Sequence, residues 1–528
     1  MSTYIPAPTK IAASVQPLEL KPSERLTQRA SLSIVASLLD YFAKVAVGLL
    51  LTPILLAVLG RALFGVWEML GRLIGYMSVT DGRPTEALRL LVANQQENAD
   101  SYSKRRYVGG ALGVWLIFLP LLIIAGVFLV WLSPIVGRVP AELHGTVRLT
   151  AALLVLNFVL LNLTALPESV LRGMNLSYKR MGLQGGLSIV GGLITAVALY
   201  IGAGLVGVAA AQVALTCLTG ILFWYVVKKY VPWFGIAKPT RADLRRLLAL
   251  GTWNTAGTFL AKLHLASDVI ILGVITSSST VTTYILTGYA AQAVTGILTL
   301  GVAAVTPGLG GLIGSRQYRT TAELRGEMIA INWLLVISIG STILMTNRSF
   351  LQLWVGEQHY AGPLANLLII LIMTQTTFIR SDAYVIDATL KMRDRVVASG
   401  IAALFSIALS ILLTPSYGIE GLCIGVLAGR SIQTLSYPFL INSCLGLPEK
   451  PRLMRVLRPA MTMCLCFAGG AFFGERFAGR NWFEWLGCVA VTFVLSLFLA
   501  FTIGLSTDSR VSVMNRITKI RQSARWNS

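Results

Sequence analysis

Five basic side chains lie inside long apolar stretches of this sequence: Lys44, Arg72, Lys262, Arg380 and Arg430. An ionisable group near the centre of a bilayer is expensive to place, so each one is a candidate for function. A guanidinium group binds phosphate oxygens through two parallel hydrogen bonds, and a lysine acts on them as a point charge. The pattern therefore predicts a cationic site for an anionic group inside the membrane.

Two of these cations have an acidic residue at helical spacing. Asp40 precedes Lys44 by four residues, and Glu68 precedes Arg72 by four. Side chains at this spacing meet on one helix face, so each cation could be neutralised within its own helix. A paired cation can also line a cavity, and both interpretations stay open for Lys44 and Arg72.

The other three cations have no such partner. Lys262 has no acid at helical spacing on its own segment, although its long stem could let it snorkel. Arg380 is two residues from Asp382, a spacing at which side chains face different ways on a helix. Arg430 lies in a late segment, farther from the expected centre of the site, and is the weakest of the five candidates.

Acidic residues and one histidine are candidates for coupling to an ion. A carboxylate near buried cations can exchange a proton or bind sodium, or can simply neutralise a cation. His264 precedes Asp268 by four residues, which suits a proton-responsive pair or a packing hydrogen bond. The candidates are Asp40, Glu68, His264, Asp268, Asp382 and Asp387.

A last group of charged residues lies near the ends of apolar segments. Residues at such a boundary are expected to form gates or helix contacts rather than to bind a ligand. The gate candidates are Asp81, Glu86, Arg89, Glu168 and Arg172.

The chain that must position these residues is apolar from residue 31 to 505. Hydrophobic residues make up 55% of the sequence, charged residues 13%, and the mean hydropathy is +0.71. A spanning helix needs roughly 20 mostly apolar residues, and the chain offers roughly fourteen such segments. The expected fold is an all-α polytopic membrane protein with spans near 33–58, 63–92, 108–133, 148–173, 183–203, 205–228, 247–275, 281–313, 326–346, 363–390, 397–414, 419–442, 459–475 and 484–505.

The net charge of +21 gathers in alternate joints, such as residues 104–106, 228–246 and 391–395. The joints between them, such as 201–205, carry few basic residues or none. Basic loops stay on the cytoplasmic side, so we expect both termini in the cytoplasm and no nucleic-acid partner. The six cysteines lie in or beside apolar runs, where packing is their expected role, and we expect no metal site.

An internal repeat divides the chain into two halves. Residues 176–207 overlay 390–421 without a gap, including the turns at 204–207 and 418–421, and 60–67 weakly resembles 280–286. Parallel repeats of this kind place a substrate between two lobes that work by alternating access. The expected parts are a disordered cytoplasmic tail (1–30), a six-helix N-lobe (31–230), a cytoplasmic linker (231–246), a six-helix C-lobe (247–445), two further helices (459–505) and a basic cytoplasmic tail (506–528).

Several short motifs resemble one family. The segment 51–67, LTPILLAVLGRALFGVW, resembles the first hairpin of polysaccharide flippases, the Wzx-type branch of the MOP (multidrug/oligosaccharidyl-lipid/polysaccharide) superfamily. Asp81-Gly82 followed by residues 86–89 is similar to the second helix of that branch, and the turn 204–210 is similar to its usual pattern. Helix number, lobe repeat and loop lengths match over nearly the whole chain. Arg83-Pro84 departs from the pattern, because it interrupts the usual run of small residues.

The resemblance implies a MATE-like fold and a substrate. That substrate is an undecaprenyl-pyrophosphate-linked oligosaccharide, such as an O-antigen, exopolysaccharide or capsule repeat unit. The chain would move it from the cytoplasmic to the periplasmic leaflet of a bacterial inner membrane. Membrane lipids and assembly proteins such as a polysaccharide polymerase would be partners. No cofactor is expected, and coupling to a proton or sodium gradient or to the membrane potential is left open.

Three other functions compete with this one. A multidrug cation antiporter of the same superfamily would prefer an acidic or apolar cavity, against the excess of Lys and Arg here. A peptidoglycan-precursor flippase would carry an arginine-rich first helix, which this sequence lacks. A membrane glycosyltransferase or polymerase would need a long loop or an extramembrane domain, and the loops are short. The sequence also lacks a phosphate-binding loop for ATP. We therefore expect a transporter rather than an enzyme.

Overall fold

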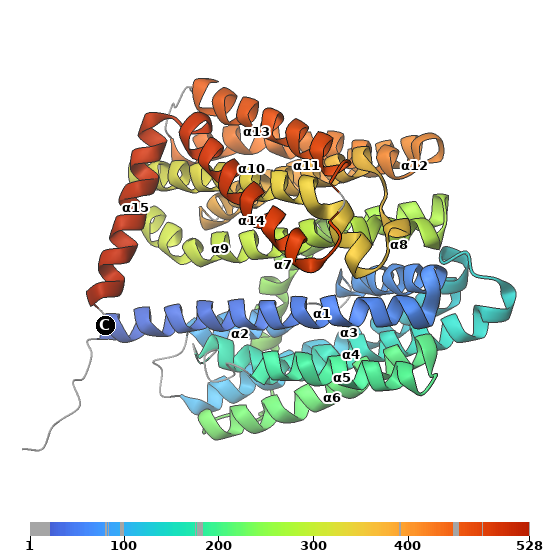
Figure 1. The fold of residues 1–528 in the computed structure, drawn as a ribbon. Helices are drawn as coiled ribbons and strands as arrows, with labels where there is room; N and C mark the ends of the chain where they lie inside the picture. Colours follow the sequence, from blue (N-terminus) through green and yellow to red (C-terminus); the bar gives the residue numbers. More distant parts are fainter. Residues whose placement is uncertain are drawn as a thin grey trace, which may run out of the picture.

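The computed structural model is helical throughout its described part, and this confirms the expected all-α fold. The described residues are 22–526, apart from 80–81, 83, 95–99, 175, 177–182, 390–391, 447–452 and 478. Within them no strand is present. Figure 1 shows two bundles of roughly parallel helices lying side by side.

The first bundle, the N-lobe, holds the helices before the linker (Figure 1). They are α1 (Pro22–Gly75), the 3-10 turn η1 (Tyr76–Val79), α2 (Pro84–Asn94), α3 (Ser101–Val136), η2 (Ala141–Leu143), α4 (His144–Gly173), α5 (Leu183–Tyr200) and α6 (Gly204–Tyr230). The start of α1 at Pro22 corrects the expected tail of 1–30. Proline fits the first turn of a helix, where its missing N–H costs nothing.

The second bundle, the C-lobe, follows α7 (Arg241–Ile275), which contacts α2 and α3 in one lobe and α12 in the other. It contains α8 (Ser278–Thr287), α9 (Tyr289–Gly314), α10 (Tyr318–Trp354), η4 (Glu357–His359), α11 (Pro363–Ala388), α12 (Met392–Leu445), α13 (Leu453–Gly474), α14 (Trp482–Leu499) and the π-helical turn η5 (Ala500–Gly504). The final segment is a further helix, α15 (Thr507–Trp526), which runs across the ends of the others (Figure 1).

Glycines allow the sharp turns at one end of the bundle. Gly60 interrupts α1 with φ +72, and Gly418 interrupts α12 with φ +54. Gly204, the counterpart of Gly418 in the repeat, also has φ +54. L side chains rarely adopt this backbone region, so the matching glycines have a shared structural cause. We call this end, with η4, the outer end, and the end with the linker and α15 the inner end.

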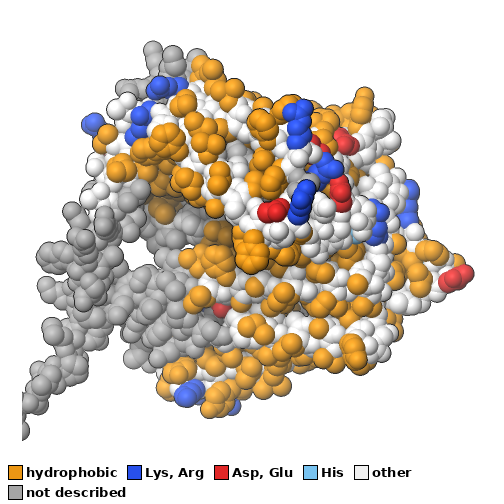
Figure 2. Space-filling model, viewed as in Figure 1, with side chains coloured by type: hydrophobic (Ala, Val, Ile, Leu, Met, Phe, Trp, Pro, Cys, Tyr) orange, Lys and Arg blue, Asp and Glu red, His pale blue; other side chains and the backbone are white. Residues whose placement is uncertain are grey.

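The outer surface of the bundles is apolar, as a lipid environment requires. Exposed side chains on α12 and α13 include Leu412, Phe439 and Leu465, each more than 70% exposed. Figure 2 shows hydrophobic side chains spread over both bundles, with charged side chains confined to a few groups. Eleven helices of the described chain are long and apolar enough to cross a membrane. Two of these contain the turns at Gly60 and Gly418, and the expected number of fourteen spans stays a prediction.

The linker is shorter than expected because α7 begins at Arg241, six residues early. Thr240 caps this helix: its hydroxyl accepts from the Asp243 N–H, and the Asp243 carboxylate accepts from the Thr240 N–H. This capping box satisfies backbone donors at the helix start. The same carboxylate binds Arg106 of α3 at 2.6 Å, which ties α7 to the N-lobe at the inner end.

Asp243→Ala should destabilise the protein through this contact. Burial raises the pKa of Asp243, but hydrogen bonds from Thr240 and then Arg106 outweigh burial and hold the pKa below its usual value. The ion pair is therefore intact at neutral pH and is lost only as the pH falls through that lowered value. We expect the free energy of unfolding to fall by about 2 kcal/mol in a denaturation assay. Glu323→Ala is the control, because its ion pair with Arg319 is exposed and should contribute almost nothing.

Candidate functional site

Polar side chains meet where α7 passes between the lobes. The Tyr76 hydroxyl, from η1 of the N-lobe, lies 2.8 Å from the Ser267 hydroxyl on α7. Tyr76 is also close enough to Arg72 and Asp268 to interact electrostatically with both. Lys262 reaches the same region, since a methyl group on Gly75 would lie 3.5 Å from its Nζ. The end of α1 and the middle of α7 thus share one polar contact zone.

The contact zone continues into the C-lobe through Asp268. The Tyr284 hydroxyl on α8 donates to Asp268 Oδ2 at 2.9 Å. Arg430 on α12 is 6% exposed and interacts electrostatically with Asp268, Tyr284 and Arg380. Its Nη1 donates to the Thr376 hydroxyl at 2.6 Å. Buried charge is tolerated here because each group has a partner.

Arg380 lies at the far side of this arrangement. Its Nη1 donates to the Thr299 hydroxyl on α9 at 2.9 Å, and the side chain is half-buried. We call the whole set the central polar cluster: Arg72, Tyr76, Lys262, Ser267, Asp268, Tyr284, Thr299, Thr376, Arg380 and Arg430. Four of the five cations predicted from the sequence belong to it.

The central polar cluster carries more positive than negative charge. Its four cations outnumber two acids: Asp268, which interacts with Arg430, and Glu68, which lies close enough to Arg72 for their charges to interact. Asp268 also lines a cavity of about 10 Å³, together with Ser267, Ser406 and Ser410. A cavity of that size holds about one water molecule. The cluster can attract an anion, and Asp268 can serve a small cation or a proton.

The fifth predicted cation, Lys44, and the remaining coupling candidates lie elsewhere. Lys44 is exposed on α1, and in the described chain no ion pair joins it to Asp40, which faces Gly185 of α5. Asp382 accepts two hydrogen bonds from Arg325, at 2.8 and 2.9 Å, rather than pairing with Arg380.

Asp387 forms a 2.7 Å ion pair with Arg395, so it has a neutralising partner. The His264 side chain lies outside the described residues.

The gate candidates do not form one group. Glu86 and Arg89 pair with each other at 2.6 Å on α2. Arg172 is exposed at the end of α4, where Glu168 is half-buried. Asp81 lies outside the described residues. A gating role for these residues therefore stays a prediction.

The lobes meet at the outer end through contacts that the sequence analysis missed. Arg61 Nη2 donates to the Thr283 hydroxyl at 2.9 Å, and the Thr282 hydroxyl donates to the Arg61 carbonyl at 2.6 Å. Arg138 of the N-lobe donates to the carbonyls of Ile275 and Thr276. The weak resemblance of 60–67 to 280–286 could have predicted these contacts, because equivalent helices of two related lobes can face each other.

Apolar packing closes the same end. One buried cluster combines Phe64 and Val66 of the N-lobe with Leu286, Phe350 and Leu351 of the C-lobe. The outer end is therefore closed both by hydrogen bonds and by a shared apolar core.

Aromatic side chains close the seam between α1 and the C-lobe. The Tyr41 hydroxyl donates to the Ala293 carbonyl at 2.8 Å, and the Tyr289 hydroxyl donates to the Val45 carbonyl at 3.3 Å. Trp354 Nε1 donates to the Leu49 carbonyl at 2.7 Å. Positions 41, 45 and 49 lie one helical turn apart, so the three contacts follow one face of α1.

An apolar groove runs beside this seam. It encloses about 320 Å³ between α1, α9, α10 and α14, and Val45, Ala293, Ile343, Val489 and Phe493 contribute to its walls. Such a groove suits a hydrocarbon chain rather than a sugar or a phosphate.

Residues 33–311 match the family described as polysaccharide biosynthesis protein, which is just over half of the chain. No curated protein matches. The chain is similar in structure to "Lipid II flippase MurJ, inward closed conformation", with a TM-score of 0.64, 14% identity, and coverage of 88% of this chain and 98% of that one.

Two multidrug transporters share the fold as well. An inward-facing MATE family transporter of the MOP superfamily gives a TM-score of 0.55 at 12% identity, covering 81% of this chain and 96% of that one. An outward-facing one gives 0.51 at 15% identity, covering 83% and 99%. At these identities the likeness establishes the fold, which is one used by membrane transporters.

Gly65→Ala should force the outer end apart. A Cβ at this position would overlap the backbone oxygen of Ser278 on α8, and neither backbone can move without separating the lobes. The measurement is the labelling rate of a cysteine introduced at Ser279 by a maleimide reagent, and we expect it to rise. Gly71→Ala is the matched control on the same helix, because nothing lies within 4 Å of its Cβ position. Equal labelling in both variants would contradict a tight contact at Gly65.

Proposed function

We propose that this chain, which belongs to the family of polysaccharide biosynthesis proteins, moves a lipid-linked oligosaccharide across the membrane. The observation that carries the proposal is the central polar cluster, where four cations are held in the middle of an apolar helical fold. A flippase for undecaprenyl-pyrophosphate-linked sugars needs a positive site at this depth, since its substrate carries a pyrophosphate past the bilayer centre.

The pyrophosphate is the part of the substrate that the cluster would bind. Arg380 and Arg72 can each offer two N–H groups to phosphate oxygens, and Lys262 adds a point charge. Arg430 is already bound to Thr376 and close to Asp268, so its expected role is to hold the site positive and in shape. Most of the cluster's groups would bind the pyrophosphate and not the sugar. This fits a carrier whose glycan projects into the space between the lobes.

Alternating access gives the order of events. With the outer end closed by Arg61, Thr283 and the shared apolar core, the substrate enters from the inner end, which we assign to the cytoplasm of a bacterial inner membrane. Binding the pyrophosphate between the lobes draws the cations of both lobes together. Closure at the inner end then favours separation of the outer contacts, and the glycan leaves on the periplasmic side.

The lipid tail would stay in the groove beside α1, α9, α10 and α14. Its walls are apolar and include Tyr289, which belongs to the aromatic seam with Tyr41 and Trp354. The head group can pass only where this seam separates, while the tail remains in contact with the bilayer. Of the last helices, α14 lines the groove and would guide the tail.

The main alternative is a multidrug cation antiporter of the same fold. Asp268 is the feature that favours it, because a carboxylate beside a water-sized cavity can bind a cation or a proton. The surplus of Arg and Lys around Asp268 opposes a cationic substrate. Asp268 is therefore assigned to the coupling ion instead.

Loss of one cation of the cluster should slow flipping. The assay follows flipping of a fluorescent undecaprenyl-pyrophosphate oligosaccharide in proteoliposomes. Arg72→Ala, Lys262→Ala and Arg380→Ala should each weaken substrate binding about 10- to 100-fold, and flipping at low substrate concentration should slow by the same factor. This is the worth of one charge-assisted hydrogen bond, roughly 1.5–3 kcal/mol. Arg319→Ala is the control, because it removes one positive charge from a side chain that is 91% exposed.

Two outcomes would contradict the proposal. One is normal flipping in all three cluster variants while they remain folded. The other is no movement of any such lipid together with efflux of cationic drugs, which would assign the chain to the multidrug function.

Filling the apolar groove should slow long-tailed substrates selectively. Val489→Trp on α14 places a large ring in the groove, so we expect slower flipping of an undecaprenyl substrate than of a short-tailed analogue. Val491→Trp is the matched control, because Val491 lies on the same helix and is 67% exposed. If both variants affect the two lipids equally, the tail does not use the groove.

A further inference from the structure

A buried histidine lies at the outer contact between the lobes. His359 ends η4 and is 2% exposed. Its N–H donates to the Gly356 carbonyl, and its carbonyl accepts from the Thr287 hydroxyl of α8 at 3.2 Å. The backbone is thus fixed against the C-lobe. The imidazole ring is not fixed in this way, because its Nδ1 is buried and has no hydrogen-bond partner. The Gln358 amide lies at 3.5 Å from its Nε2.

Arg61 of the N-lobe borders the same part of α8. Its guanidinium binds Thr283, one helical turn before Thr287. Burial first, and the charge of Arg61 second, lower the pKa of His359 below its ordinary value. The imidazole is therefore neutral while the lobes are in contact, and a proton on it would place a positive charge in a buried position next to the exposed Arg61.

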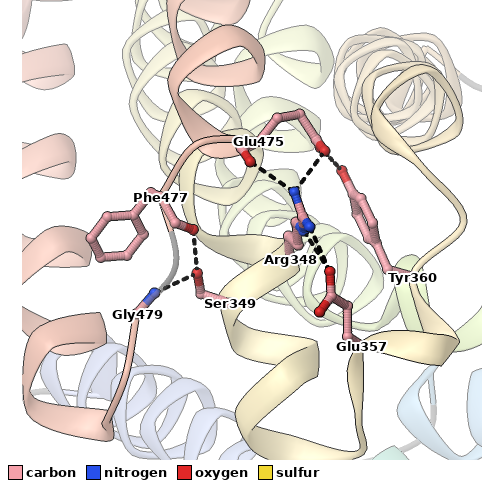
Figure 3. Close-up of polar contacts among 7 residues, drawn as sticks. All are labelled: Arg348, Ser349, Glu357, Tyr360, Glu475, Phe477 and Gly479. Atoms are coloured by element: carbon pink, nitrogen blue, oxygen red, sulfur yellow. Dashed lines mark hydrogen bonds and ion pairs between the residues drawn. The ribbon is translucent and has the colours of Figure 1, made fainter.

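The acidic groups around η4 are engaged elsewhere. Figure 3 shows Arg348 of α10 reaching both Glu357 and Glu475, at 2.6 and 3.3 Å. Tyr360 donates to the other oxygen of Glu475 at 2.7 Å. From α8 the hydroxyls of Thr283 and Thr287 face this region. In the described chain no carboxylate pairs with His359, so nothing there compensates a proton on its ring.

We propose that the imidazole of His359 is a proton-binding site whose occupation separates the lobes at the outer end. Protonation leaves a buried, uncompensated cation at His359, and the neighbouring charge of Arg61 repels it. Separation lets water reach the imidazole. The proposal rests on the alternating access of the proposed function but not on the identity of the substrate.

The direction of the pH effect follows from the two states. In the open state the imidazole meets water and has its ordinary pKa of about 6.5. In the closed state the pKa is lower, so protons favour the open state. The closed contact is fully stable above about pH 6.5 and loses stability as the pH falls below it. The ratio of open to closed protein should rise by up to about tenfold per pH unit in that window.

Distances between spin labels at the outer end test this directly. Ile201→Cys labels the N-lobe and Leu364→Cys the C-lobe, both at exposed positions, in a variant of the full chain without its own cysteines. We expect the distance to lengthen as the pH falls from 7.5 to 5. His359→Gln should remove this response. His144→Gln is the matched control, because His144 is also at the outer end but contacts the Val139 carbonyl within the N-lobe.

Arg61→Gln provides a second variant if His359→Gln does not fold. Removing the neighbouring charge raises the pKa of His359 in the closed state, so the midpoint of the response should move to higher pH. The proposal would be overturned if the distance did not change with pH in the protein with His359 intact, or if it changed equally in His359→Gln. The distance measurement needs no lipid substrate, so it is independent of the flipping assay. A pH response in a protein that flips no lipid would contradict the proposed function but would still support the proton site.

Discussion

A charge inside a bilayer must find a partner, and this constraint shapes the middle of the molecule. Arg430 is almost fully buried, yet it has Thr376 as an acceptor and Asp268 as a counter-charge. Arg380 has Thr299, and Asp268 has Tyr284. The helices α7, α8, α9, α11 and α12 therefore hold one another through polar contacts at a depth where water is scarce. The cost of burying these groups is offset only while the helices stay in this arrangement.

The same constraint connects the two lobes. α7 is tied to the N-lobe at its start by the Arg106–Asp243 ion pair, and to the C-lobe further along through Asp268. A movement of the lobes must therefore bend or tilt α7. Because the central polar cluster includes residues of α7, such a movement would change its contacts. An anion bound there interacts with cations from both sides, which is how binding energy can bias the equilibrium between two states.

The sequence predicted the fold well, because the strongest signals were long-range and redundant. Apolar segments marked the helices, and the repeat identified Gly204 and Gly418, whose backbones share one unusual conformation. The basic residues in apolar segments led to four members of the central polar cluster. The partners could not be found this way, because Tyr284, Thr376 and Thr299 are common residue types whose position depends on how helices pack. Asp382 shows the same limit: its partner, Arg325, lies far away in the sequence.

Whether the central polar cluster recognises the charged head group can be measured by lipid binding. Native mass spectrometry or titration of the full chain in detergent would compare undecaprenyl pyrophosphate with undecaprenol, which has the same tail and no charge. We expect the pyrophosphate lipid to bind at least about tenfold more tightly, because one charge-assisted hydrogen bond contributes that much, and we expect Arg380→Ala to reduce this difference. Equal binding of the two lipids would contradict it, because the central polar cluster would then have no part in recognising the substrate.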